Sequence, residues 1–391
     1  MPTPLLAERV RRDVDAVSRA GLDLETFLEE AVESVARAVP SVGACLGTHD
    51  PATFLLTSAR KYGALRDTNT YDHEFGLIEY GTSEPTAFGE LARAAVPAAG
   101  VHALTGGEVE RSGRMSRFMT PHFGFADEMR LVFREAGAAW GALALFRGPD
   151  DVPFGTAEIE FMASLTEVFA RGVRTGMLCR LSDSEVGTAA GGPAVLIIGP
   201  DDTVSQMSVG AESRLLELST GASGGDPAGM IASLLGAARR LARGETATTP
   251  RSRIRTANGT WLVLHAAPLS AAGDRGVGDV VITIEEARPP EIVSLVVAAF
   301  DLTPRERDVT QLVLQGLDTK EIAASLHVSP WTVQDHLKTV FTKADVRSRR
   351  ELISRVYFDQ YVPRMGAELS PSGWFAPALP TPREEAATSS R

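Results

Sequence analysis

The sequence is poor in cysteine and lacks any long apolar run. Its 391 residues include two cysteines, Cys45 and Cys179, which are too few for a disulfide framework or a four-cysteine zinc site. The longest apolar stretch, Ile292–Phe300, is interrupted by Ser294 and is much shorter than the roughly 20 residues that cross a bilayer. The N-terminus is charged by Glu8 and has no apolar signal core. We therefore expect a cytoplasmic protein without membrane contact.

The usual catalytic and metal-binding signatures are also missing. No Walker loop, His-Glu-x-x-His or Cys-x-x-Cys pattern occurs, so we predict no enzymatic activity, no cofactor and no metal. Gly221–Gly225 satisfies the Gly-x-Ser-x-Gly pattern, but a nucleophile elbow needs a strand directly before the serine. Here a helix is predicted to end at Leu218. An enzyme acting on a small ligand remains a minor alternative.

Positive charge is scarce except in one segment. The chain has a net charge of −11, yet Leu302–Arg355 contains nine Lys/Arg against seven Asp/Glu. A mildly basic module on an acidic body indicates that only this segment contacts phosphate.

Length and periodicity predict a multidomain α+β protein. The helical and strand patterns, with their Pro and Gly breaks, divide the chain into an N-terminal helix 1–20, an α/β domain 21–180, a linker 181–193, a smaller α/β domain 194–286, a linker helix 287–301, an all-α four-helix domain 302–361 and a disordered tail 362–391.

Four short helices are predicted between residues 302 and 355. Each begins with capping residues, which satisfy the free backbone N–H groups of a first helical turn: Thr303-Pro304-Arg305-Glu306, Asp318-Thr319-Lys320-Glu321, Ser329-Pro330 and Ser348-Arg349-Arg350-Glu351. The second and third helices are joined by the short turn His327-Val328, which predicts a helix-turn-helix.

The third of these helices has one apolar and one polar side. Apolar side chains recur at helical spacing at Val333, Leu337, Val340 and Phe341. The opposite face presents Thr332, Gln334, Asp335, Lys338, Thr339 and Thr342, side chains able to reach base edges or phosphates in a major groove. A plain helical bundle with a solvated face has the same periodicity, so the pattern alone leaves both interpretations open.

The motifs of this segment resemble the LuxR-type DNA-binding domain. The similarity covers Leu302–Arg355 and is carried by Leu302–Arg307, Thr319–Ala323, Leu326–Ser329 and Thr332–Lys338, with Lys343 and Arg347-Ser348-Arg349 beyond. The resemblance implies DNA contacts by Thr332, Gln334, Asp335 and Lys338, with Lys320, Lys343 and Arg347 on the phosphate side. Two positions depart from the pattern: Gln334 stands where many relatives are basic, and Ala344-Asp345 stands where Leu-Gly is commoner.

The two α/β domains resemble sensor domains. Leu24–Met177 is similar to GAF domains of actinobacterial regulators through Gly107–Arg114, Pro121–Gly124, Glu128–Arg130 and Trp140–Leu145, and Ala194–Glu285 looks like a PAS-type fold. Several side chains in these domains have two interpretations. Cys45 could anchor a chromophore, His265 could ligate haem, and Arg111, Arg114 and Arg130 could bind an anionic effector. We expect instead a core cysteine, a structural histidine and surface salt links.

Together these features predict a one-component transcription regulator whose helix-turn-helix is controlled by GAF-like and PAS-like domains. Its expected partners are double-stranded DNA, RNA polymerase and a small-molecule effector. One such module buries only about 600–1,000 Å² on DNA, so we expect a homodimer, formed through the N-terminal helix Leu6–Val17 or the sensor domains. A sigma-factor-like protein and a protein-interaction module are the alternatives.

Overall fold

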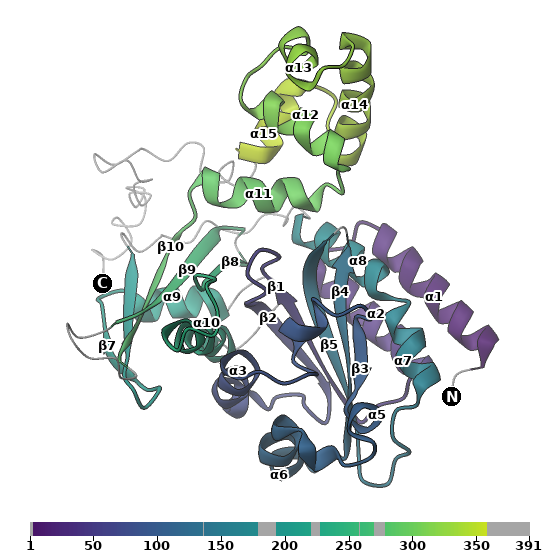
Figure 1. Cartoon of the computed structure of the whole chain (residues 1–391), viewed down its shortest axis with the longest axis vertical. Helices are drawn as coiled ribbons and strands as arrows, with labels where there is room; N and C mark the ends of the chain where they lie inside the picture. The colour runs from purple at the N-terminus through teal and green to yellow at the C-terminus, as the bar shows by residue number, and fades with distance from the viewer. Residues whose placement is uncertain are drawn as a thin grey trace, which may run out of the picture.

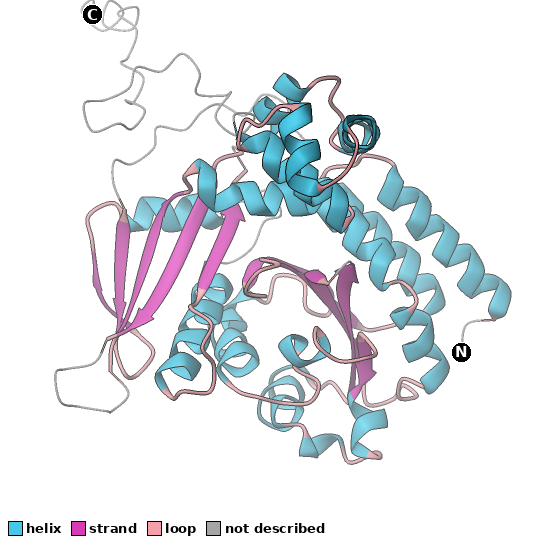
Figure 2. Cartoon of the chain, turned by 45° about the horizontal axis from the view of Figure 1, so that its top comes forward, coloured by secondary structure: helices cyan, strands magenta, loops and turns pink. Residues whose placement is uncertain are grey.

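The computed structural model describes residues 3–135, 137–178, 193–219, 227–257, 259–269 and 278–357. Two five-stranded sheets with flanking helices are followed by a helical domain (Figures 1 and 2). The predicted α+β fold class is confirmed. Several parts of the sequence discussed above lie outside the described residues: the predicted tail 362–391, most of the predicted linker 181–193, Cys179 and Gly221–Gly225.

The first α/β unit, residues 4–178, is built on a sheet with the strand order β2-β1-β5-β4-β3. Its strands are β1 (Gly43–His49), β2 (Leu56–Gly63), β3 (Ala98–Gly100), β4 (Asp127–Glu135) and β5 (Ala138–Arg147). One face is covered by α1 (Pro4–Arg19), α2 (Leu24–Ala38), α7 (Thr156–Ala163) and α8 (Thr166–Leu178). The apolar residues of α1, Val10 and Val14, are fully buried in this unit's core. The apolar side of this helix is therefore used within the chain.

The other face carries short helical segments. These are α3 (Asp72–Gly81), α4 (Phe88–Leu91), α5 (Val101–Thr105), α6 (Thr120–Phe123), two 3₁₀ turns at Asn69–Tyr71 and Val109–Arg111, and a π-helix at Met115–Met119. Helix α4 is short and does not continue beyond Ala92. The Arg134 guanidinium of β4 donates to the carbonyl oxygens of Ala92, Ala94 and Ala95, so these carbonyls are used by β4 and not by a longer helix.

The second α/β unit, residues 194–286, repeats the strand order of the first. Its elements are β6 (Ala194–Ile198), β7 (Val204–Met207), α9 (Ala211–Ser219), α10 (Pro227–Ala242), β8 (Arg251–Arg255), β9 (Trp261–Pro268) and β10 (Val280–Glu286). The order β7-β6-β10-β9-β8 places the second, first, fifth, fourth and third strands side by side, as in the first sheet. Strands β8 and β9 form a hairpin in which Arg255 pairs with Trp261.

Glycines allow α3 of the first unit to cross α10 of the second at close range (Figure 1). A Cβ added to Gly236 would lie 2.7 Å from the backbone nitrogen of Gly81, and one on Gly76 would lie 2.6 Å from the Cβ of Ala232. Sequence analysis did not predict α3, since the residues that bury it belong to a segment more than 140 positions away in the chain.

We expect Gly236→Val to destabilise the protein by about 1–3 kcal/mol, because overpacking against backbone atoms cannot be relieved by rotamer changes. Chemical denaturation measures this effect. Gly89→Ala in α4 is the matched control. Its added Cβ meets only the Arg93 guanidinium at 3.8 Å, so we expect no loss of stability. Equal behaviour of the two variants would contradict the close crossing.

The chain continues through α11 (Pro289–Ala299) into the C-terminal helical domain, which consists of α12 (Pro304–Leu314), α13 (Thr319–Leu326), α14 (Pro330–Lys343) and α15 (Arg349–Tyr357). These are the four helices predicted from the capping residues. Helix α11 is apolar on two sides. Ile292 and Leu295 join the core shared by the α/β units, whereas Val296 and Phe300 join the core of the helical domain. No helix in the described ranges is both long enough and apolar enough to span a bilayer.

Candidate nucleic-acid interface

Local side-chain hydrogen bonds set the starts of the helices in the C-terminal domain. Thr303 accepts from the backbone N–H of Glu306 at 3.3 Å, and the Glu306 carboxylate accepts from the N–H of Thr303 at 2.8 Å. Ser329 caps α14 by accepting from Thr332 N–H at 3.1 Å. His327 adopts a left-handed conformation, with φ of 54°, at the end of α13. This residue makes the tight turn that aims α14 away from α13.

Helix α14 buries one side and exposes the other, as predicted. Val333, Leu337 and Val340 are buried. Gln334, Asp335, Lys338, Thr339 and Thr342 are exposed, Thr332 is half-buried, and the indole of Trp331 at the start of the helix is 77% exposed.

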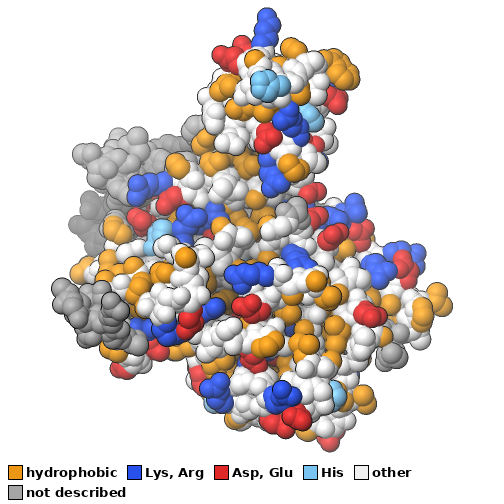
Figure 3. Space-filling model, in the orientation of Figure 1, with side chains coloured by type: hydrophobic (Ala, Val, Ile, Leu, Met, Phe, Trp, Pro, Cys, Tyr) orange, Lys and Arg blue, Asp and Glu red, His pale blue; other side chains and the backbone are white. Residues whose placement is uncertain are grey.

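The N-terminus of α13 lies beside this polar side. The Gln334 amide donates to the Thr319 hydroxyl at 3.3 Å, and the exposed Lys320 follows directly in the chain. The backbone N–H groups of Lys320 and Glu321 at this helix start donate to the Asp318 carboxylate, at 2.7 and 2.8 Å. The capped start of α13 and the exposed Lys320 therefore lie next to the polar side of α14. On the face of this domain that Figure 3 shows, basic and acidic side chains are interspersed.

Lys343 is the predicted DNA contact that the structure places differently. Its ammonium lies 2.7 Å from the Glu306 carboxylate and 2.8 Å from the carbonyl oxygen of Asp301. Burial acts to raise the pKa of Glu306, but the hydrogen bonds from Lys343 and Thr303 outweigh it, so this pKa lies below its ordinary value. Lys343 therefore ties the end of α14 to the start of α12, and Glu306 already balances the charge that it would offer to a phosphate.

The unusual turn after α14 keeps a regular geometry. Ala344 is buried, and Asp345 adopts a left-handed conformation with φ of 51°, a region that glycine enters most easily but aspartate also tolerates. Val346 N–H donates to the carbonyl of Phe341 at 2.9 Å, which closes the turn. Arg347 beyond it is exposed.

Comparison with known proteins agrees with this geometry. A family model described as "Bacterial regulatory proteins, luxR family" matches residues 301–356. The C-terminal domain belongs to the luxR family. A Mycobacterium bovis protein named "Putative HTH-type transcriptional regulator" is 54% identical over 52 residues, 13% of this chain and 6% of that protein. The transcriptional regulatory protein DesR of Bacillus subtilis is 39% identical over 67 residues, 17% of this chain and 34% of DesR. The match thus spans only a small part of either relative.

Solved structures give weaker likenesses. Escherichia coli SdiA aligns over 88% of this chain and 94% of SdiA with 11% identity and a TM-score of 0.31. A GAF domain from a Coxiella burnetii phosphoenolpyruvate-protein phosphotransferase aligns over 43% of this chain and 93% of that domain, with 14% identity and a TM-score of 0.28. At these scores neither structure identifies a function for the α/β units.

The first α/β unit contains a buried ionic cluster where surface links were expected. Arg114 and Arg130 are both almost fully buried and pair with Glu128 at 2.7 Å, and Arg130 also lies 2.8 Å from Glu79. Burial acts to raise the pKa of Glu128, but the two arginines hold it below its ordinary value. The prediction of surface links is therefore wrong for these two arginines, since their partners lie on β4 and α3 inside the unit. Arg111 is exposed near Glu108.

The other singled-out side chains of the α/β units are Cys45 and His265. Cys45 is largely buried, and this burial raises the pKa of its thiol to about 11, which keeps it protonated and a poor nucleophile. His265 on β9 is half-buried. Its pKa is lowered mainly by this burial and secondly by the positive charge of Arg251. No three His, Cys, Asp or Glu side chains suited to a metal ion gather among the residues covered by the structure.

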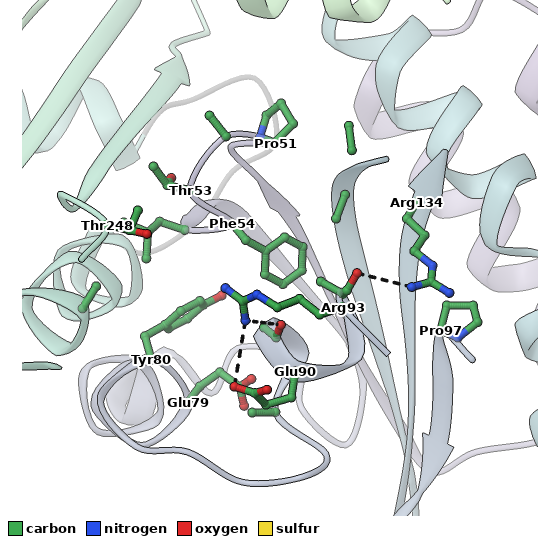
Figure 4. A pocket seen from close by; sticks show the side chains of 18 of the residues that line it. Pro51, Thr53, Phe54, Glu79, Tyr80, Glu90, Arg93, Pro97, Arg134 and Thr248 are labelled. Atoms are coloured by element: carbon green, nitrogen blue, oxygen red, sulfur yellow. Dashed lines mark hydrogen bonds and ion pairs between the residues drawn. The ribbon is translucent and has the colours of Figure 1, made fainter. Parts of the chain in front are cut away.

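A cleft of about 850 Å³ lies between the two α/β units, and sequence analysis did not predict it (Figure 4). Phe54 and Tyr80 project into it, with Arg93 near Tyr80 and Thr248 across from them. Phe54 has φ of 58°, a strained conformation for a bulky residue, and stacks on buried His49, which hydrogen-bonds to the Tyr80 hydroxyl at 2.7 Å. No motif marks this group, because its members come from separate segments.

Proposed function

We propose that this chain is a sequence-specific DNA-binding transcription regulator whose luxR-family domain is controlled by the two α/β units. The observation that supports this most directly is the exposed polar side of α14 beside the N-terminus of α13, within a domain of the luxR family. The mechanism is binding rather than catalysis. Exposed lysines release counterions from DNA, and the polar side chains of α14 read base edges.

The base-reading set is Thr332, Gln334 and Lys338, with Asp335 either accepting from cytosine N4 or lying off the DNA. Lys320 and Arg347 are proposed to contact phosphate. The test is a titration of the full chain with a duplex enriched by in vitro selection, compared with a random duplex at the same salt concentration. Equal affinity for the two duplexes would contradict sequence-specific binding.

We further propose a cytoplasmic homodimer that engages RNA polymerase and responds to a small-molecule effector in the cleft. One domain of this size supports little specificity alone, whereas two copies bind half-sites about one helical turn apart. The buried apolar side of α1 argues against this helix as the dimer contact. We therefore propose that other surfaces of the α/β units form the dimer. A sigma-like role would instead require stable binding to core polymerase, which a pull-down tests.

The salt dependence of DNA binding separates Lys320 from Lys343. We expect Lys320→Ala to reduce the slope of log affinity against log salt concentration by about one unit, because one phosphate contact is lost. Lys343→Ala removes the same charge but should leave the slope unchanged, since its ammonium is held by Glu306. Anisotropy titrations between about 50 and 200 mM salt measure both slopes. If both variants lower the slope equally, Lys343 reaches the DNA.

A further inference from the structure

Arg253 on β8 contacts two other parts of the molecule. Its Nε and Nη2 donate to the two carboxylate oxygens of Asp50, at 2.7 and 2.6 Å. Asp50 directly follows β1 of the first α/β unit. The Nη1 group donates to the carbonyl oxygen of Glu291 and to the hydroxyl of Ser294, both at 3.0 Å. These two acceptors lie on α11, the helix that leads into the luxR-family domain.

Both charges of this pair are buried and fully satisfied. The side chains of Arg253 and Asp50 are 1% and 0% exposed, and Asp50 also accepts from the backbone N–H groups of Arg253 at 3.1 Å and Ala52 at 2.9 Å. A two-pronged guanidinium–carboxylate pair fixes angle as well as distance. Leaving either charge unpaired in the protein interior is strongly unfavourable. The pair therefore holds Asp50 and Arg253 in a single arrangement relative to each other.

Helix α11 needs such a directional contact. Its two apolar sides pack against the α/β units through Ile292 and Leu295, and against the helical domain through Val296 and Phe300. Apolar packing is non-directional. The hydrogen bonds from Arg253 to Glu291 and Ser294 fix the rotation of α11 about its own axis and its position along that axis.

We propose that Arg253 is a positioning residue that fixes α11, and through it the orientation of α14, relative to both α/β units. The turn that carries Asp50 continues into Pro51–Phe54, which line the cleft. This junction is thus a polar route from the cleft to the DNA-binding domain. Its consequence for DNA rests on the proposed function, whereas its consequence for α11 does not.

Amide hydrogen exchange on the full chain tests the positioning directly. Arg253→Met should raise exchange in residues 293–299 by about tenfold or more, because the helix loses its polar anchor, while the amides of α12–α14 keep the wild-type rate.

Ser294→Ala is a second test that does not depend on the folding of Arg253→Met. It removes only one contact to α11 and leaves the buried ion pair intact, so it should raise exchange in the same residues even if Arg253→Met folds poorly. Arg253→Lys should not restore the wild-type rate. Arg37→Met, which removes a cation paired with Asp13 away from the cleft, is the control. Wild-type exchange of α11 in both Arg253→Met and Ser294→Ala would overturn the proposal.

Half-site spacing tests the consequence for DNA. A dimer in which α14 is rigidly held should lose affinity for DNA steeply when the spacing between two selected half-sites is changed by about 5 bp, half a helical turn. Ser294→Ala and Arg253→Met should tolerate that change better than the wild type. Identical spacing profiles would overturn the role in orienting α14. If no form of the protein binds any duplex, the proposed function fails, and the exchange result still decides whether Arg253 positions α11.

Discussion

Replacement of Lys338 by alanine is expected to weaken binding to a selected duplex by about 1–3 kcal/mol, roughly 5- to 150-fold. Lys338 is exposed on the polar side of α14, four residues after Gln334 and therefore on the same side of the helix. Within the described part of the chain its ammonium has no hydrogen-bond or ion-pair partner, in contrast to Lys343. It is thus free to donate to a base edge or a phosphate, and a fluorescence anisotropy titration at fixed salt measures the loss.

The control for this variant is Arg12→Ala on α1. It removes the same charge from a side chain that is 74% exposed and lies on α1 of the first α/β unit, outside the luxR-family domain (Figure 1). We expect little change in affinity at physiological salt, where charges beyond about 8 Å are largely screened. Equal losses in the two variants would show a general charge effect, and retained affinity in Lys338→Ala would remove this residue from the interface.

Arg130→Met should lower the free energy of unfolding by about 3–5 kcal/mol, the cost typical of removing one partner from a buried ion pair. Arg130 is 0% exposed and holds Glu128 at 2.7 Å and Glu79 at 2.8 Å. It also lies 3.9 Å from the ring centroid of Phe88. Methionine fills similar space but leaves the Glu79 carboxylate buried with a weaker contact to Arg114, at 3.7 Å.

Two comparisons separate this effect from loss of packing. Adding Glu79→Gln to Arg130→Met should recover part of the stability, because the unpaired carboxylate becomes neutral. Arg11→Met breaks an exposed pair with Glu8 and should change stability by less than about 1 kcal/mol. Chemical denaturation measures all three variants, and a loss under about 1 kcal/mol for Arg130→Met would contradict a stabilising cluster.

The same cluster predicts the direction of a pH effect. The pKa of Glu128 is lowered in the folded protein because the arginines outweigh its burial. Its contribution to stability is therefore complete above the ordinary carboxyl pKa, and it is lost as the pH falls through the lowered value.

Some features of this protein follow from the sequence alone. The helix starts at Thr303, Asp318 and Ser329 depend on hydrogen bonds to residues two or three positions away. The polar side of α14 follows from the 3.6-residue period. These interactions are local, so the residues that make them are adjacent in the chain, and both the helix-turn-helix and its exposed side chains could be predicted.

Only the tertiary structure decided the partners of the charged groups and the place of the cleft. Asp50 and Arg253 are 203 positions apart, and the expected phosphate contact Lys343 pairs with Glu306, 37 positions away. Arg114 and Arg130 were expected at the surface because arginine is rarely buried. Instead Glu128, on the same strand as Arg130, pairs with both arginines inside the unit, and Glu79 of α3 lies 2.8 Å from Arg130. A charged side chain carries no local signal of which distant segment will cover it. Its role is fixed only when the sheets and helices meet and water is excluded from between them.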